Sequence, residues 1–239
     1  MNNSWLTPPS DFLSNMGEHD RDSLIALSSK HVYQKGDYIF QSGDLGRYVY
    51  VLSRGRAKIS QLSPAGKEMI LWFCLPGEMF GLAELPRGGM REVSAQACSD
   101  AELYVINRGD FNDFLVQHPT TAMQVIDLLS CRMRVLGHVL MNLAADDVTS
   151  RIIKLILRLG ARYPHSAANG AHLDYPMTHQ EMADMVGTSR QTVTSVLGQL
   201  KKQGVVSMER HCIRIENQDE LEQLLSKVAD EPMRDRDYH

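Results

Sequence analysis

The chain has 239 residues, of which 43% are hydrophobic and 23% are charged, a composition typical of a soluble globular protein with room for two modest domains. Its longest apolar run, Met69–Leu75, is far too short to cross a membrane, and the N-terminus lacks the pattern of a signal peptide. The four cysteines are scattered without a CxxC pair, which predicts no metal site and reduced thiols. We therefore expect a cytoplasmic protein that does not associate with membranes.

The charge is distributed unevenly along the chain. The formal net charge of −4, taken alone, argues against binding to nucleic acid. Residues 148–216, however, carry nine lysines and arginines against five aspartates and glutamates, and the segments on both sides are acidic. A basic block of this kind is typical of a surface that contacts phosphates, so DNA binding is favoured for this part of the chain.

The first part of the chain is expected to form short helices and then many short strands. Residues 1–10 have little to bury, and residues 11–29 indicate one or two short helices. From residue 35 to residue 106, β-rich runs alternate with glycine-containing turns at roughly ten-residue spacing, which predicts a β-sandwich or rolled barrel. The expected strands are Tyr38–Gln41, Tyr48–Leu52, Ala57–Leu62, Met69–Leu75, Arg91–Ala97 and Glu102–Ile106.

A long helix is expected from Thr120 to Leu143. Its apolar residues recur at alternating spacings of four and three, which is the a/d pattern of a coiled-coil seam. The seam residues are Ala122, Ile126, Leu129, Met133, Leu136, Leu140 and Leu143. The same stripe would also serve a helix that lies on its own domain. We favour a dimer seam because a helix-turn-helix, which is expected directly downstream, usually binds DNA as a two-fold dimer.

Two helices joined by a tight turn are expected between Thr178 and Gln203. A preceding helix, capped by Asp146 or Asp147, runs from Val148 to about Tyr163 and is followed by a loop at 164–170. In the helix pair, Met182, Ala183 and Val186 form the buried face of the first helix, and Gly187 ends it. Thr188 or Ser189 caps the second helix, which buries Val193, Val196, Leu197 and Leu200. This arrangement predicts a helix-turn-helix.

The exposed face of the second helix carries side chains suited to DNA. An arginine can donate twice to guanine and a glutamine can pair with adenine, while lysines at the far end can reach phosphates. The candidate DNA-binding residues are Ser189, Arg190, Gln191, Thr194, Ser195, Lys201, Lys202 and, at the tip of a hairpin, Arg210. That hairpin, Val205–Met208 with Cys212–Ile215, is the expected wing, and a last helix is expected at Glu220–Ala229.

The order of these parts resembles the CRP/FNR family of bacterial transcription regulators. The segments that carry the resemblance are KGDYIFQSGD (35–44), LSRGRAKISQLSPAGKEMIL (52–71), PGEMFG (76–81), DDVTSRI (146–152) and TSRQTVTSVLGQL (188–200). The resemblance implies an α+β fold with an N-terminal double-stranded β-roll (jelly roll), a long central dimerisation helix and a C-terminal winged helix-turn-helix. The expected domains are 1–119, 120–145 and 146–229, followed by a charged tail at 230–239.

The resemblance also implies a homodimer in which a signal in the β-roll controls binding to a palindromic operator and contact with RNA polymerase. Gln191 falls where many members have a glutamate that reads the operator, and Ser195 falls where cyclic-AMP-binding members have a second arginine. Because glutamate suits cytosine and glutamine suits adenine, we expect a half-site different from that of the cyclic-AMP members.

The expected effector pocket departs from the cyclic-nucleotide pattern. Its candidate residues are Gly81, Leu82, Glu84, Arg91, Glu92, Arg132 and Leu136. Where cyclic-nucleotide members have Gly-Glu and Arg-Ser, this chain has Gly81-Leu82 and Arg91-Glu92, with a turn one residue shorter. Leucine cannot accept a hydrogen bond from ribose, and a carboxylate near phosphate is unfavourable. The sequence therefore argues against cyclic AMP as the effector.

Other effectors stay open. No cysteine precedes Cys74, which argues against an iron–sulfur cluster. A haem is possible, with His31, His118 and His138 as isolated candidate ligands, and residues 82–90 with their glycine pair offer a cradle for an anion such as cyclic di-GMP. The chain is not expected to be an enzyme. The alternative is a cupin-like metalloenzyme or a ligand-binding module fused to a helix-turn-helix. The metalloenzyme would need strand histidines for its metal, and none lies between Val32 and Gln117.

Overall fold

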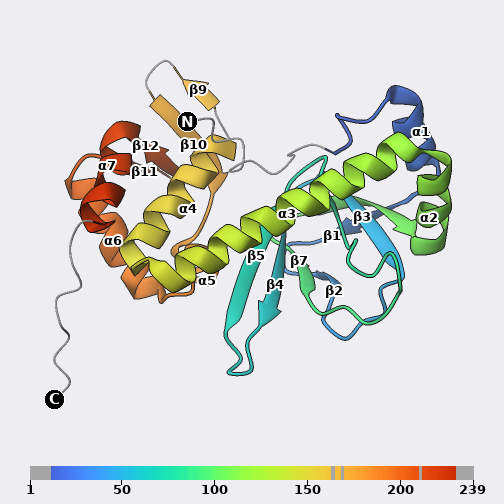
Figure 1. The fold of residues 1–239 in the computed structure, drawn as a ribbon, viewed down its shortest axis with the longest axis horizontal. Helices are drawn as coiled ribbons and strands as arrows, with labels where there is room; N and C mark the ends of the chain where they lie inside the picture. The colour runs from blue at the N-terminus through green and yellow to red at the C-terminus, as the bar shows by residue number, and fades with distance from the viewer. Residues whose placement is uncertain (1–11, 163–164, 168–169, 210–211, 230–239) are drawn as a thin grey trace. The chain divides into compact units, whose positions relative to one another are not determined.

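The computed structural model describes residues 12–162, 165–167, 170–209 and 212–229 (Figure 1). The chain divides into two compact units, Pro8–Leu136 and Gly137–His239, and we describe each by itself. The long helix α3, Pro119–Ala145, contributes to both units and begins and ends within two residues of the expected helix.

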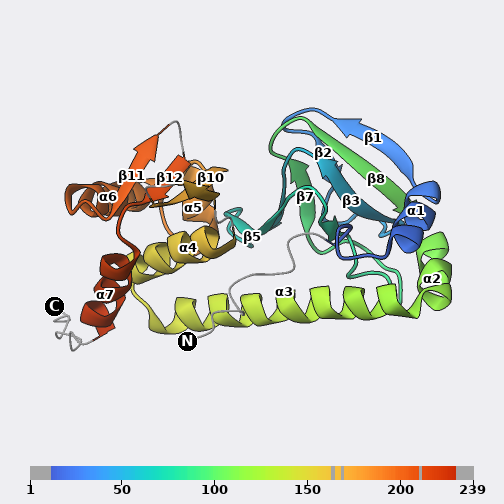
Figure 2. The ribbon, with the colours of Figure 1, turned by 90° about the horizontal axis from the view of Figure 1, so that it is seen from above.

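Two antiparallel sheets of four strands make up the β-roll of the first unit (Figure 2). The first sheet has the order β1 (Ser29–Tyr33), β8 (Ala101–Asn107), β3 (Tyr48–Arg54) and β6 (Met79–Phe80). The second has the order β2 (Tyr38–Phe40), β7 (Ser94–Ala97), β4 (Ala57–Leu62) and β5 (Glu68–Cys74). All six expected strands are present, and the jelly-roll prediction is confirmed.

The strand β3 is buried on both faces, which explains its uninterrupted apolar sequence. Tyr50 and Leu52 belong to the core between the two sheets, whereas Val49 and Val51 belong to a second core under the helices. That second core includes Phe111 and Phe114 of α2, Arg108–Gln117, and Leu24 of α1, Glu18–Ala26. A strand with helices on one face and a sheet on the other loses the alternation of a half-buried strand.

Three elements of this unit were not expected from the sequence. The strand β1 has four exposed residues out of five, so no apolar alternation marks it. The two-residue strand β6 is too short to leave a pattern. The helix α2 is short, and its start is fixed by Asn107, whose side-chain oxygen accepts the backbone N–H of Gly109 at 2.8 Å.

The second unit is a winged helix. Its helices are α4 (Val148–Arg162), α5 (His179–Val186), α6 (Arg190–Lys202) and α7 (Gln218–Ala229). Its strands form an antiparallel sheet in the order β11 (Val206–Glu209), β12 (Cys212–Ile215), β10 (Gly170–Pro176) and β9 (His165–Ala167). The expected wing hairpin is present as β11 and β12. The segment at 164–170, expected to be a loop, instead contains β9, and β10 begins at its end.

The turn between α5 and α6 is defined by local chemistry. Thr178 and Glu181 form a reciprocal capping box at the start of α5, and Gly187 ends α5 with a φ of 73°. This left-handed conformation favours glycine because a Cβ would be strained there. Of the two expected caps of α6, Ser189 is the one that acts: its hydroxyl accepts the backbone N–H of Thr192 at 3.1 Å. The turn therefore sets the direction in which α6 leaves α5.

Candidate functional site

The helix α6 buries one face and exposes the other. Val193, Val196, Leu197 and Leu200 are buried, as expected, and α6 packs against α5 and α4. The candidate DNA-binding residues that follow the cap, namely Arg190, Gln191, Thr194 and Ser195, are all exposed. We call these four residues the recognition face. Because the opposite face is fixed in the core, the recognition face is presented to the surroundings on a rigid element.

Three side chains of the recognition face are available for contacts outside the chain. In the described part of the chain, Arg190, Gln191 and Ser195 make no side-chain hydrogen bond or ion pair. An arginine and a glutamine without internal partners keep their full donor and acceptor capacity, which bidentate contacts to base edges require. Lys201 and Lys202 lie exposed in the last turn of α6. Arg210 lies outside the described residues.

Thr194 and Ser189 are bound within the protein. The hydroxyl of Thr194 donates to the backbone carbonyl of Arg190 at 2.9 Å, and it lies 2.8 Å from Nδ1 of His179. The hydroxyl of Ser189 serves as the cap of α6. These internal hydrogen bonds were not expected from the sequence, because His179 and Thr194 belong to different helices and are fifteen residues apart.

The candidate effector pocket in the β-roll is occupied by an internal ion pair. The guanidinium of Arg91 donates through Nη1 to the carboxylate of Glu84, and only 2% and 9% of the two side chains are exposed. Arg91 also donates to the backbone carbonyls of Gly81, at 3.1 Å, and Tyr48, at 2.5 Å. Most of the hydrogen-bonding capacity that a phosphate would need is thus taken by the protein itself.

Aromatic rings enclose this ion pair. The guanidinium carbon of Arg91 lies 4.2 Å from the ring centre of Phe40 and 5.9 Å from that of Tyr50. Burial raises the pKa of Tyr50 to about 12, although the nearby Arg91 acts in the opposite direction, so Tyr50 is a neutral phenol at physiological pH. Phe40 and Tyr50 were not among the candidate residues, because nothing in a strand pattern distinguishes an aromatic residue that faces a cation from one in the core.

The other candidate pocket residues lie in different surroundings. Leu82 is part of the core under the helices, and Glu92 is exposed. Arg132 donates to the carbonyl of Met79 at 2.5 Å and lies over the ring of Trp72 at 5.0 Å. Leu136 is half-buried on α3. The structure therefore brings Gly81, Glu84 and Arg91 together, and it leaves Leu82 and Glu92 out of that group.

The outward face of α3 is apolar and exposed. Of the seam residues, Met133 and Leu140 have exposed fractions of 71% and 66%, and Ile126, Leu129 and Leu143 have 53%, 40% and 39%. The face of α3 that packs into the β-roll unit uses different residues, Val125 and Leu128, which are 5% and 2% exposed. The apolar stripe is therefore separate from the residues that hold α3 in its own unit.

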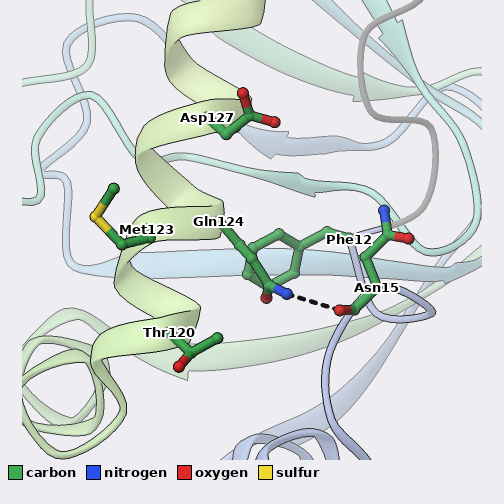
Figure 3. A pocket seen from close by; sticks show the side chains of 6 residues that line it. All are labelled: Phe12, Asn15, Thr120, Met123, Gln124 and Asp127. Carbon is green, nitrogen blue, oxygen red and sulfur yellow. Dashed lines mark hydrogen bonds between the residues drawn. The ribbon is translucent and has the colours of Figure 1, made fainter.

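A shallow hollow lies between the start of the described chain and α3 (Figure 3). Its lining includes Phe12, Met123 and Asp127, and Gln124 donates from Nε2 to the carbonyl of Asn15 at 2.6 Å. It has no cationic side chain, so it does not suit an anionic ligand.

Neither a metal centre nor a membrane span stands out in the described residues. They contain no group of three or more histidine, cysteine, aspartate or glutamate side chains placed to hold a metal ion. None of the helices described is long and apolar enough to cross a bilayer.

These features define a class of protein. A winged helix with an exposed polar recognition face, joined through a long helix to a β-roll, is the architecture of a DNA-binding regulator with a ligand-binding type of domain. The family comparisons agree: the cyclic nucleotide-binding domain matches residues 30–118, and the Crp-like helix-turn-helix domain matches residues 150–224.

Individual relatives place the chain more closely. The cAMP-activated global transcriptional regulator CRP of Pasteurella multocida is 30% identical over 178 residues, which cover 74% of this chain and 85% of that protein. The cyclic AMP receptor protein of Thermus thermophilus is 29% identical over 208 residues, which cover 87% of this chain and 93% of that protein. The fold is shared with a CooA mutant from Carboxydothermus hydrogenoformans, with a TM-score of 0.78 at 18% identity over 91% of this chain and 96% of that one.

The chain belongs to the CRP/FNR family of transcription regulators. It combines a cyclic-nucleotide-binding type of domain with a DNA-binding helix-turn-helix, and its relatives are regulators and not enzymes. The family resemblance expected from the sequence is confirmed, and the cupin-like enzyme is excluded.

The buried ion pair leads to a stability prediction. Replacing Glu84→Ala should lower the free energy of unfolding by about 3–5 kcal/mol, because the guanidinium of Arg91 would stay buried without its counter-charge. Urea unfolding measures the loss. The matched control is Glu92→Ala, an exposed carboxylate one position after Arg91, which should change the free energy by less than about 0.5 kcal/mol. Equal losses in the two variants would contradict the pairing.

Proposed function

We propose that the chain is a homodimeric transcription regulator that reads a palindromic operator with α6 and whose β-roll does not take cyclic AMP. The observation that carries the operator reading is the recognition face, with three side chains free of internal partners at the start of a capped helix. The first turns of such a helix are the part that enters the major groove.

In this arrangement each side chain has its own part in reading the operator. Arg190 donates to the O6 and N7 atoms of guanine, and Gln191 pairs with adenine. The hydroxyl of Thr194 is already bonded to the carbonyl of Arg190, so a base contact by Thr194 uses its methyl group against the methyl of thymine. Lys201, Lys202 and the wing residue Arg210 contact phosphates, which fixes the position of the helix without adding sequence specificity.

Dimerisation is proposed to use the exposed stripe on α3. A helix of 27 residues is about 40 Å long, which is enough for a seam of several turns. Five of the apolar seam residues are at least 39% exposed in the single chain, and burying them against a second copy removes that surface from water. A two-fold dimer would present two recognition faces to half-sites about 34 Å apart.

The β-roll pocket is proposed to be closed to cyclic AMP by the pair of Glu84 and Arg91. A phosphate that approached Arg91 would have to displace a buried carboxylate and would then leave it without its partner, which is costly. Haem gains no support either: the ring of His118 is stacked on that of Phe114, with centres 4.1 Å apart, and neither of the two described hollows is lined by His31, His118 or His138. The effector, if the regulator has one, is therefore expected to bind elsewhere.

A polar cluster at the end of α3 is proposed to transmit the signal to the winged helix. The ammonium of Lys154, on α4, donates to Asp146 at 2.7 Å and to the side-chain oxygen of Asn142 at 3.2 Å. Arg151 donates to the carbonyls of Asp146, at 2.9 Å, and Val186, at 3.1 Å. A change at the end of α3 would thus reach both α4 and α5, and the DNA-bound dimer would then recruit or block RNA polymerase.

The seam can be tested with one introduced carboxylate. Met133→Asp should convert the dimer into a monomer, because a charge would be buried at the centre of the apolar stripe. Arg134→Asp places the same group one position further along α3, away from the seam, and should leave a dimer. Sedimentation velocity gives the mass of each variant. A dimer in both variants, or a monomer in both, would refute the assignment of the seam.

The operator reading can be tested with one chemical change at two positions of α6. Gln191→Glu should change the preferred base at one position of each half-site from adenine to cytosine, because a carboxylate accepts from N4 of cytosine but cannot donate to adenine. Gln199→Glu, the same change at an exposed position two turns later, should leave the preferred sequence unchanged. Operator selection followed by sequencing reports the preference.

Loss of the arginine provides a second measurement on the same DNA. Arg190→Ala should weaken specific binding by about 1–3 kcal/mol per half-site, with little effect on random DNA. An equal loss on random DNA would show that Arg190 contacts phosphate, and an unchanged base preference in Gln191→Glu would exclude a base contact by that residue.

A further inference from the structure

A second hollow in the β-roll unit has the chemistry of an anion site. It has a volume of about 380 Å³, which lies within the range of small-molecule pockets, and three chain segments form its walls. They are residues 45–47 before β3, the turn at Gly88 and Gly89, and the junction of β8 with α2 at residues 107–109. Backbone hydrogen bonds join these walls: the N–H of Gly46 donates to Gly89, and the N–H of Arg108 donates to Arg47.

Two arginines supply the charge of this hollow. Arg47 and Arg108 both line it, and in the described part of the chain neither guanidinium has a carboxylate within ion-pair distance. Within the described residues the guanidinium of Arg108 makes one long hydrogen bond, from Nη1 to the carbonyl of Glu84 at 3.4 Å. Asp110, the carboxylate in the first turn of α2, is not part of the lining. Two guanidiniums without a counter-charge favour a ligand with two negative charges.

Glycines keep the walls open for such a ligand. Gly88 and Gly89 have φ values of 69° and 119°, a region that side chains rarely adopt. A Cβ on Gly88 would lie 2.7 Å from Nη1 of Arg108, so a side chain there would displace the guanidinium. Nothing lies within 4 Å of a Cβ on Gly89. Glycine at position 88 therefore lets the guanidinium of Arg108 lie against the backbone of this turn, and Gly89 leaves the hollow open beside it.

We propose that this hollow binds the phosphate group of a small phosphorylated metabolite, held between Arg47 and Arg108. The site is separate from the pocket of Arg91, whose charge is already balanced by Glu84. It is nevertheless connected to that pocket. Gly46 lines the hollow, and a Cβ added to it would lie only 2.6 Å from Cβ of Glu84, so the backbone at Gly46 lies directly against the side chain of Glu84. A ligand on Arg108 thus contacts the loop that carries Glu84.

Calorimetric titration of the full-length protein tests this site. The result of the titration does not depend on the proposed operator reading. The probes are inorganic phosphate and adenosine 5′-monophosphate at constant ionic strength. We expect saturable binding with one site per chain, and tighter binding of the monoester because the hollow has room beyond a phosphate. Arg47→Gln and Arg108→Gln should each weaken binding about 10- to 100-fold, the effect of losing a hydrogen-bonded charge.

The matched control is Arg87→Gln. Arg87 belongs to the same loop and is exposed but does not line the hollow, so its loss should leave the affinity unchanged. Equal affinity for the two probes would support the site with free phosphate as its ligand. The proposal is overturned if neither probe binds saturably, if the affinity survives in both Arg47→Gln and Arg108→Gln with wild-type thermal stability, or if Arg87→Gln loses as much as they do. DNA binding of these variants, measured separately, reports on the operator reading alone.

Discussion

A guanidinium that is withdrawn from water needs a counter-charge, and in the β-roll Arg91 has one in Glu84. Much of the structure around it follows from this need. The backbone carbonyls of Gly81 and Tyr48 accept further N–H groups of the guanidinium, and the ring of Phe40 covers it. In a pocket that binds a phosphate, the ligand supplies the missing negative charge. Here the carboxylate of Glu84 supplies it, which supports the proposal that this pocket does not take cyclic AMP.

The faces of α3 and α6 that lie outside the core are the ones to which we assign dimerisation and operator reading. The helix α3 buries Val125 and Leu128 and leaves Ile126 and Met133 exposed, so it is available for a second copy. The helix α6 buries Val193 and its apolar neighbours and leaves the recognition face exposed. In both helices the period of 3.6 residues separates a buried face from an exposed one, so the same helix can stabilise its own unit and offer a surface to a partner.

The winged helix and α3 were predictable because their determinants are local. A cap, a glycine and an apolar stripe within a few residues define the turn before α6, and the alternating spacing defines α3. The unexpected parts depend on distant contacts. The strand β1 is recognised only by its pairing with β8, about seventy residues later, and α2 by the core that it covers. The pair of Glu84 and Arg91 was missed, although both were candidate pocket residues, because Glu84 lies in the turn at residues 83–87, where spacing predicts no geometry. The arginines of the second hollow, Arg47 and Arg108, come from separate segments and carry no motif.

The most direct test of the closed pocket is the affinity of the purified, ligand-free protein for its selected operator, measured by fluorescence anisotropy with and without saturating cyclic AMP. We predict that the nucleotide changes the dissociation constant by less than about twofold, because no differential binding energy is available to it. An increase in affinity of about tenfold or more with cyclic AMP that persists in Arg108→Gln, and so does not depend on the second hollow, would contradict a pocket closed by the protein's own carboxylate.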